Sequence, residues 1–248
     1  MKGSDVRLVT APEWSVVIPA FNEARRLPSY LAEIAAYFDG RDEPYEVLVA
    51  DDGSTDGTAE AVAAIVRAHP AVRVLRHEWN EGKGAAVRRG MLAARGQYRL
   101  FADADGATPI VELKRLEAAL MAGAQIAIGS RARLDPSVSV VARPHRVLAG
   151  RVFSRIVRRL GLPGVIDSQC GFKAFTAPAA TDLFARLRTS GFGFDVELLL
   201  LAQAAGYRVT EVPVNWTDQP GSKVRVLVNG PGILRQAVAA RLRMGRRR

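Results

Sequence analysis

Short apolar runs alternate with longer stretches of helical periodicity over the first half of the chain. The runs predict strands at residues 14–20, 45–50, 72–77, 98–102 and 125–129. The intervening stretches predict helices at residues 23–38, 58–68, 84–95 and 110–122. Alternation of strands and helices at this spacing is typical of an α/β fold with a doubly wound, mostly parallel sheet.

Polar residues follow directly on each predicted strand. In a doubly wound sheet, ligands bind beyond the carboxyl ends of the strands. The polar segments there are residues 19–23, 51–58, 80–84, 103–105 and 130–131. Asp56 and Thr58 are equally suited to capping the following helix. Taken together, the five segments favour a nucleotide-type ligand site.

The strongest single signal is the pair Asp103 and Asp105, which follows an apolar strand and precedes Gly106. Two carboxylates at this spacing repel each other unless a cation lies between them. A hard divalent cation prefers such oxygen ligands and leaves positions open for phosphate oxygens. Lys83 lies between two glycines, as in a phosphate loop, but the GxxxxGK[ST] spacing is absent. We therefore expect neither a P-loop NTPase nor, without GxGxxG, a dinucleotide-binding site.

The length of 248 residues, of which 48% are hydrophobic, fits one large globular domain or a domain with an appendage. The single cysteine, Cys170, excludes an intrachain disulfide framework and favours a reducing compartment. The first residues are polar and predict no signal peptide. The apolar run at residues 198–202 is too short to cross a bilayer. We expect a protein that does not span a membrane.

The net charge of +10 is concentrated in two places: eight arginines between residues 131 and 160, and five between 241 and 248. Such patches suit nucleic acid, anionic lipid or phosphorylated substrates. Nucleic-acid binding is disfavoured because Phe153 is the only aromatic ring among these arginines. In the segment 146–160, apolar residues recur every fourth position with arginines on another face. This pattern suits either a membrane interface or packing on the sheet.

These motifs together resemble the family 2 glycosyltransferases, over about residues 14–224. The general part of the resemblance lies in residues 16–23, 51–58 and 80–84 and in the Asp103/Asp105 pair. A narrower resemblance, to the dolichyl- and polyprenyl-phosphate β-glucosyltransferases, lies in residues 101–108, 129–132, 167–175, 192–199, 211–216 and 221–223.

The resemblance implies a GT-A fold and assigns roles to named residues. The donor nucleotide sugar would contact Pro19, Phe21, Glu23, Ala50, Asp52, Asp103, Ala104, Asp105 and Gln169. Asp103 and Asp105 would hold Mg²⁺ or Mn²⁺, and the catalytic residues would be Asp105, Arg131 and Lys223. Residues 1–224 would form one catalytic domain, followed by a basic amphipathic segment at 225–248.

The resemblance also implies an activity, namely inverting transfer of glucose from UDP-glucose to polyprenyl or dolichyl phosphate. The alternatives are a GDP-mannose-dependent polyprenyl-phosphate mannosyltransferase and a family 2 transferase with a non-lipid acceptor. Ala107 and the Thr217–Gln219 segment depart from mannosyl-transferring relatives and favour glucose. A lipid phosphate needs no general base, and we expect all three histidines in surface loops. The enzyme would act on the cytoplasmic face of an anionic membrane, without crossing it.

Overall fold

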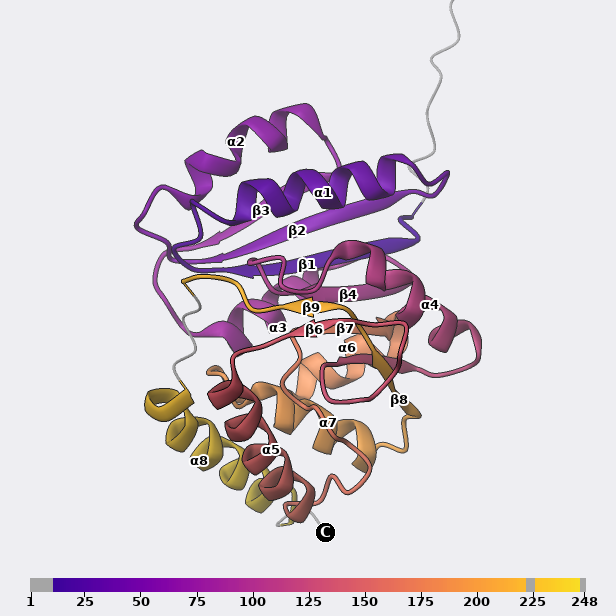
Figure 1. Cartoon of the computed structure of the whole chain (residues 1–248). Helices are drawn as coiled ribbons and strands as arrows, with labels where there is room; N and C mark the ends of the chain where they lie inside the picture. Colours follow the sequence, from indigo (N-terminus) through magenta and orange to yellow (C-terminus); the bar gives the residue numbers. More distant parts are fainter. Residues whose placement is uncertain (1–10, 222–225, 246–248) are drawn as a thin grey trace, which may run out of the picture.

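The computed structural model describes residues 11–221 and 226–245, and a seven-stranded sheet forms its centre (Figure 1). The strand order is β3-β2-β1-β4-β7-β5-β8. The bounds are β1 Trp14–Ala20, β2 Tyr45–Asp52, β3 Val72–His77, β4 Tyr98–Ala102, β5 Ile126–Ser130, β7 Phe172–Thr176 and β8 Val209–Pro213. A separate two-stranded sheet pairs β6 Val140–Val141 with β9 Trp216–Thr217.

The main sheet is parallel except for β7, which runs antiparallel to both neighbours, β4 and β5. Ala102 at the end of β4 therefore lies opposite Phe172 at the start of β7. This arrangement brings the segment before β7 to the edge of the sheet where the parallel strands end. The functional residues of both chain halves can meet at that edge.

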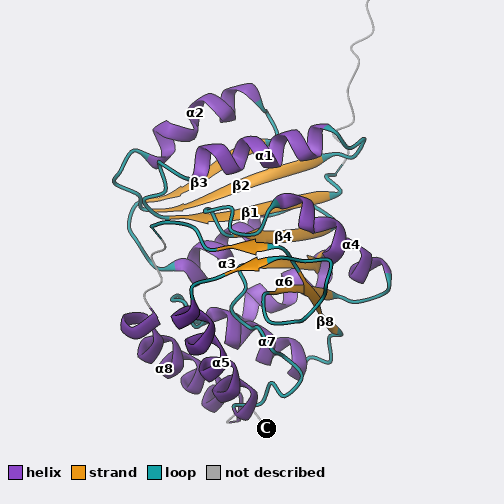
Figure 2. Ribbon diagram, viewed as in Figure 1, coloured by secondary structure: helices purple, strands orange, loops and turns teal. Residues whose placement is uncertain are grey.

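Helices cover both faces of the sheet (Figure 2). The helices are α1 Leu27–Asp39, α2 Thr58–Ala68, α3 Lys83–Ala93, η1 Ile110–Glu112, α4 Leu113–Met121, α5 Pro144–Arg159, α6 Ala177–Arg186, α7 Phe194–Ala204 and α8 Val226–Gly245. Apolar side chains of α1, α2 and α4 form one core with one face of the sheet. Side chains of α3, α5, α6, α7 and α8 form a second core on the other face. The predicted doubly wound, mostly parallel α/β fold is confirmed.

The predicted elements of the first half are all present, with shifted ends. β2 extends to Asp52, so that two aspartates end the strand itself. α1 begins at Leu27 instead of residue 23, because residues 23–26 form a turn closed by the amide N–H of Leu27 and the carbonyl of Glu23. The predicted 110–122 helix divides into η1 and α4.

The expectation that all three histidines lie in surface loops is wrong. His77 is the last residue of β3, where its Nδ1 lies 2.7 Å from the carbonyl oxygen of Trp79. His145 lies within α5. His69 alone lies outside an element, directly after α2. The strand pattern of β3 includes His77, and the helical pattern of α5 includes His145. A single histidine is not enough to end either element.

The basic helix α5 leaves much of its apolar stripe uncovered. Leu148 is 65% exposed and Val152 48% exposed, whereas Ile156 and Leu160 on the same stripe are half-buried; the fully buried Val157 lies on another face of the helix. Packing on the sheet therefore accounts for only part of this stripe. The C-terminal helix α8 buries Ala237 and Ala240 in the second core. Within residues 11–221 and 226–245, every helix is too short or too polar to pass through a bilayer.

Candidate active site

A cavity of about 360 Å³ opens beyond the carboxyl ends of β1, β2 and β4. Seven of the predicted donor-binding residues line it: Pro19, Phe21, Glu23, Asp52, Asp103, Ala104 and Asp105. Ala50, also predicted to bind the donor, is buried in β2, where it pairs with Pro19 of β1, and it is not among the residues that line the cavity. Arg131 and Gln169 belong to an adjacent polar network, and Lys223 lies outside the described residues.

Asp103 and Asp105 both contribute carboxylates to this cavity, because the chain turns immediately after β4. The amide N–H of Asp103 donates to the carbonyl of Gly171 at 2.9 Å, and the amide N–H of Ala107 donates to Oδ1 of Asp105 at 3.1 Å. Gly106 between them has a φ of +63°, which glycine adopts without steric cost. The turn directs both side chains toward the same space.

Two cations face the carboxylates. Nζ of Lys83 lies 2.6 Å from Oδ1 of Asp103, and Nη1 of Arg26 lies 3.7 Å from Oδ2 of Asp105. Burial and the charge of Asp103 raise the pKa of Asp105 above its usual range. Burial lowers the pKa of Lys83, but the nearby carboxylates of Asp103 and Asp195 outweigh it and raise that pKa overall. The cavity therefore holds closely spaced charges of both signs.

The carboxylate oxygens at this site fit a hard divalent cation that is coordinated partly by the protein and partly by a bound ligand. Asp103 and Asp105 supply carboxylate oxygens, which Mg²⁺ and Mn²⁺ prefer. Among the residues that the structure describes, no group of three or more histidine, cysteine, aspartate or glutamate side chains forms a complete metal cage. A cation bound here would complete its coordination with ligand or water oxygens, as Mg²⁺ does at phosphate sites.

Asp52 connects the cavity wall to the segment before α3. Its Oδ2 accepts a 2.7 Å hydrogen bond from the amide of Gly82, and its Oδ1 lies 2.6 Å from Nη2 of Arg89. Gly82 has a φ of +108°, and a Cβ on Gly84 would lie 2.4 Å from the carbonyl oxygen of Thr189. Glycines at both positions therefore allow Lys83 to enter the cavity close to the loop before α7.

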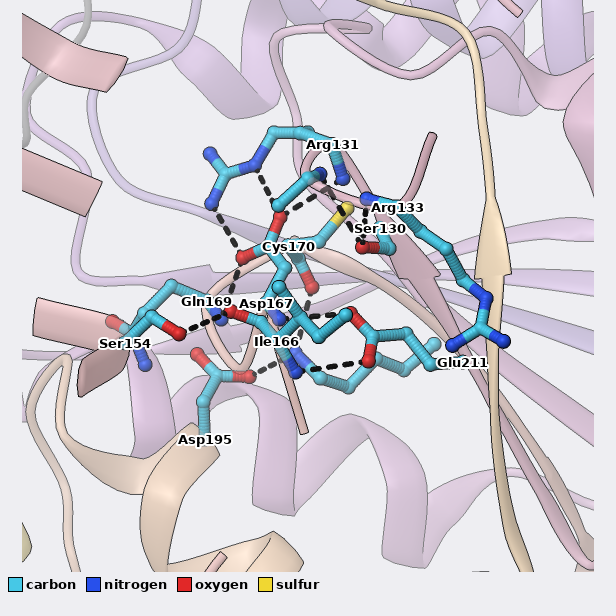
Figure 3. A network of polar contacts seen from close by, with 12 residues as sticks. Ser130, Arg131, Arg133, Ser154, Ile166, Asp167, Gln169, Cys170, Asp195 and Glu211 are labelled. Atoms are coloured by element: carbon cyan, nitrogen blue, oxygen red, sulfur yellow. Dashed lines mark hydrogen bonds and ion pairs between the residues drawn. The ribbon is translucent and has the colours of Figure 1, made fainter. Parts of the chain in front are cut away.

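The network beside the cavity centres on Asp167 (Figure 3). Arg131 donates to Asp167 from Nε at 2.7 Å and from Nη2 at 2.8 Å, and its guanidinium lies over the ring of Trp216. Burial raises the pKa of Asp167, but the Arg131 charge outweighs it and lowers that pKa to about 2. Glu211 accepts hydrogen bonds from the amides of Ile166 and Asp167. The segment before β7 is thereby fixed.

The fully buried Lys173 also holds the segment that precedes β7. Nζ of Lys173 donates to the carbonyl of Cys170 and to Oδ1 of Asp195, both at 2.6 Å. Burial raises the pKa of the Cys170 thiol to about 12, so that it stays protonated. Gln169 lies in this segment, and its buried amide nitrogen has no hydrogen-bond partner among the described residues.

Seven residues that line the cavity were given no individual site role from the sequence: Ala20, Arg26, Asn80, Gly82, Lys83, Ala86 and Phe192. Lys83 carried a signal, since it lies between glycines after a strand, but its spacing matched no phosphate loop. Arg26 resembles an ordinary helix residue in the sequence. Phe192 comes from the loop before α7, and its segment entered the sequence analysis only through the family resemblance at residues 192–199, which gave it no individual role.

Comparison with known proteins agrees with this geometry. Residues 15–184 match the model of glycosyl transferase family 2. The chain is 42% identical to a Drosophila melanogaster protein named dolichyl-phosphate beta-glucosyltransferase, over 86% of this chain and 69% of that protein. It is 40% identical to the Homo sapiens protein of the same name, over 85% of this chain and 69% of that protein.

Solved structures share the fold. Glucosyl-3-phosphoglycerate synthase from Mycobacterium tuberculosis, in complex with Mn²⁺, UDP and glucosyl-3-phosphoglycerate, matches with a TM-score of 0.67 and 23% identity, covering 92% of this chain and 78% of that chain. Mannosyl-3-phosphoglycerate synthase from Rubrobacter xylanophilus matches with a TM-score of 0.71 and 20% identity, covering 96% and 76%. The predicted GT-A type of fold is confirmed by these likenesses. The chain belongs to glycosyl transferase family 2, in which its relatives include dolichyl-phosphate beta-glucosyltransferases.

Proposed function

We propose that this protein transfers glucose from UDP-glucose to a polyprenyl or dolichyl phosphate, with inversion at the sugar carbon. The observation that carries the proposal is the cavity in which Asp103, Asp105 and Lys83 meet at the strand ends. The names of relatives at 40–42% identity support the glucosyl group and the lipid phosphate acceptor. UDP in the complex of a structural neighbour supports the nucleotide.

The reaction is a single displacement. An oxygen of the acceptor phosphate forms a bond to C1 of glucose while the bond from C1 to the diphosphate oxygen breaks, and UDP leaves with that electron pair. Negative charge grows on the diphosphate, and fixed positive groups stabilise such charge. Lys83 and Arg26 both line the cavity and supply positive charge there.

Mg²⁺ or Mn²⁺ would be held by Asp103 and Asp105. When bound, the ion would supply further charge stabilisation for the leaving diphosphate. Mn²⁺ in the complex of a structural neighbour supports a divalent ion of this kind. Pro19, Phe21, Glu23 and Asp52 would contact the nucleotide beside it.

The acceptor phosphate would approach from the side of the Asp167 network. Arg131 would contact its charge, together with Lys223, and Gln169 would lie near the sugar and the acceptor. The buried Gln169 amide nitrogen without a partner supports a ligand contact there. A phosphate monoester with a second pKa of ~6 is mostly dianionic at neutral pH, so that no side chain has to remove a proton from it.

Membrane attachment would use the uncovered stripe of α5. Leu148 and Val152 are exposed together with Arg151 and Arg155 on the same helix. Apolar and cationic groups on one helix suit the interface of an anionic leaflet. The enzyme would work on the cytoplasmic face, where its acceptor's phosphate lies at the bilayer surface.

The test is a transfer assay with the purified full chain. UDP-glucose and GDP-mannose are each combined with a short-chain polyprenyl phosphate and, separately, with 3-phosphoglycerate, with Mn²⁺, with Mg²⁺ or with chelator. We expect β-linked glucosyl polyprenyl phosphate to form from UDP-glucose, and we expect its formation to require a divalent ion. Transfer from GDP-mannose alone, or to phosphoglycerate alone, would replace this proposal with one of the alternatives.

A further inference from the structure

A second cavity, of about 710 Å³, lies between α7, the loop before it and the last turns of α8. α8 runs along the lower edge of the molecule in Figure 1, beside α5. Gly161, just after α5, also lines the cavity, and a Cβ there would lie 3.2 Å from Nε of Arg241. None of the residues that line the donor cavity contributes to this one.

The lining carries four arginines, Arg186, Arg188, Arg241 and Arg243, and one carboxylate, that of Glu197. Glu197 is already neutralised: its Oε1 lies 3.0 Å from Nη2 of Arg243, and its Oε2 accepts the amide N–H of Thr189 at 2.7 Å. The cavity therefore has a strong excess of positive charge.

Not all of the other three arginines in the lining form ion pairs with carboxylates. Arg186 pairs with Asp182 at 3.2 Å, and both side chains are more than one third exposed, so this pair is weak. Arg188 and Arg241 form no ion pair with any residue in the described part of the chain. Two guanidinium groups on different elements thus face one hollow without a counter-ion from the protein.

The walls are partly apolar. Leu200, Leu201 and Met244 line the cavity. Leu242, between Arg241 and Arg243 on the same turn of α8, is exposed to solvent. Guanidinium groups bind phosphate oxygens through paired hydrogen bonds. We propose that this second cavity binds a phosphate-bearing anion through Arg188 and Arg241. The arginines suit the phosphate of an anionic phospholipid headgroup and the apolar wall suits the hydrocarbon next to it, whereas free phosphate presents the phosphate chemistry alone.

The test compares three full-length proteins: wild type, the double variant Arg188→Gln/Arg241→Gln, and a matched control. The control, Arg67→Gln/Lys114→Gln, removes the same charge from exposed positions on α2 and α4. Binding is measured by co-sedimentation with vesicles of phosphatidylcholine alone and of about three parts phosphatidylcholine to one part phosphatidylglycerol. Separately, inorganic phosphate is titrated without vesicles, with melting temperature as the readout.

We expect the Arg188/Arg241 double variant to bind phosphatidylglycerol vesicles about 30-fold more weakly than wild type, since each arginine near an anionic surface contributes about fivefold. The control should change by about threefold or less, as expected for screened distant charges. A response to vesicles alone assigns the site to a lipid headgroup, and a response to phosphate that the double variant loses assigns it to free phosphate.

Equal losses in both double variants, or no loss in either arm, would overturn the proposed site. UDP binding is measured in the same samples and should be the same in all three proteins, because the donor cavity is separate. This second measurement also shows that each variant is folded. If wild type does not bind UDP, the proposed donor is contradicted. The arginine cavity is then still tested by the vesicle and phosphate measurements.

Discussion

The carboxylates of Asp103 and Asp105 differ in their positively charged partners. Asp103 is paired closely with Lys83, whereas Asp105 has Arg26 only at 3.7 Å and a raised pKa. Its Oδ1 also accepts the backbone N–H of Ala107. An amide oxygen at position 105 can accept the same hydrogen bond. Substitution to asparagine therefore removes the charge and keeps the turn.

We predict that Asp105→Asn lowers the transfer rate by ~100- to 1000-fold, the typical cost of losing one electrostatic contact to a leaving group. Initial rates with UDP-glucose at several Mn²⁺ concentrations measure this effect. Asp42→Asn, at an exposed position in the α1–β2 loop, is the control and should retain wild-type rates. A rate for Asp105→Asn within a few-fold of wild type would remove Asp105 from the site.

Gly171 supports Asp103 by leaving room for it. A Cβ at position 171 would lie 2.1 Å from Oδ2 of Asp103, so the carboxylate would have to move. We predict that Gly171→Ala lowers the transfer rate by about 100-fold through misplacement of this group and lowers the free energy of unfolding by only about 1 kcal/mol. Gly164→Ala, where a Cβ meets nothing within 4 Å, should change neither quantity. Equal rates for the two variants would contradict the prediction.

Asp167 makes a prediction about acid stability. Its pKa is about 2 when folded, below that of a free aspartate, so its ionised form stabilises the fold above about pH 5 and this contribution is lost as the pH falls toward 2. Wild type should exceed Asp167→Asn by at least roughly 2–3 kcal/mol in unfolding free energy near neutral pH. Urea denaturation at decreasing pH should show this gap narrowing. A gap independent of pH would be evidence against the depressed pKa.

At the scale of elements, the first half of the sheet follows from the sequence because each strand there is a continuous buried run. β1 is buried at all seven positions and ends at the polar segment of the site. The second half of the sheet is harder to predict from the sequence. β7 contains the buried Lys173, and this charged residue interrupts the apolar run by which a buried strand is recognised. The Asp167 ion pair with Arg131 was also not predicted, because its partners lie 36 residues apart with no periodic relation.

The exposed stripe of α5 yields a prediction at this scale. We expect Leu148→Gln/Val152→Gln to weaken binding to anionic liposomes and to raise the KM for a long-chain lipid acceptor by about 100-fold, since each fully inserted aliphatic side chain contributes ~1.5 kcal/mol or more. Activity with a short, water-soluble prenyl phosphate should not change. The control Val111→Gln/Met121→Gln removes two equally exposed apolar side chains from η1 and α4. Similar losses in both variants would argue against α5 as the attachment site.

At the scale of the whole molecule, the arrangement of titratable groups predicts the pH dependence of the reaction. No histidine is among the residues that line the donor cavity. If the acceptor is a lipid phosphate, the rate should fall on the acid side with an apparent pKa of ~6, that of the acceptor itself. His69→Gln, His77→Gln and His145→Gln should each leave this profile in place. Loss of ~100-fold for any of them, the usual cost of removing a general base, would contradict the base-free mechanism.

The antiparallel strand β7 also has a consequence for the order in which the chain folds during synthesis. Among the strands that the structure describes, β5 pairs only with β7 and β8, and the edge of β4 that faces away from β1 pairs only with β7. A nascent chain that ends before residue 172 therefore carries β5 without a partner strand and β4 with an open, apolar edge. Open edges of this kind invite pairing with other chains. Emergence of five residues, Phe172–Thr176, is the moment at which the two parts of the sheet join.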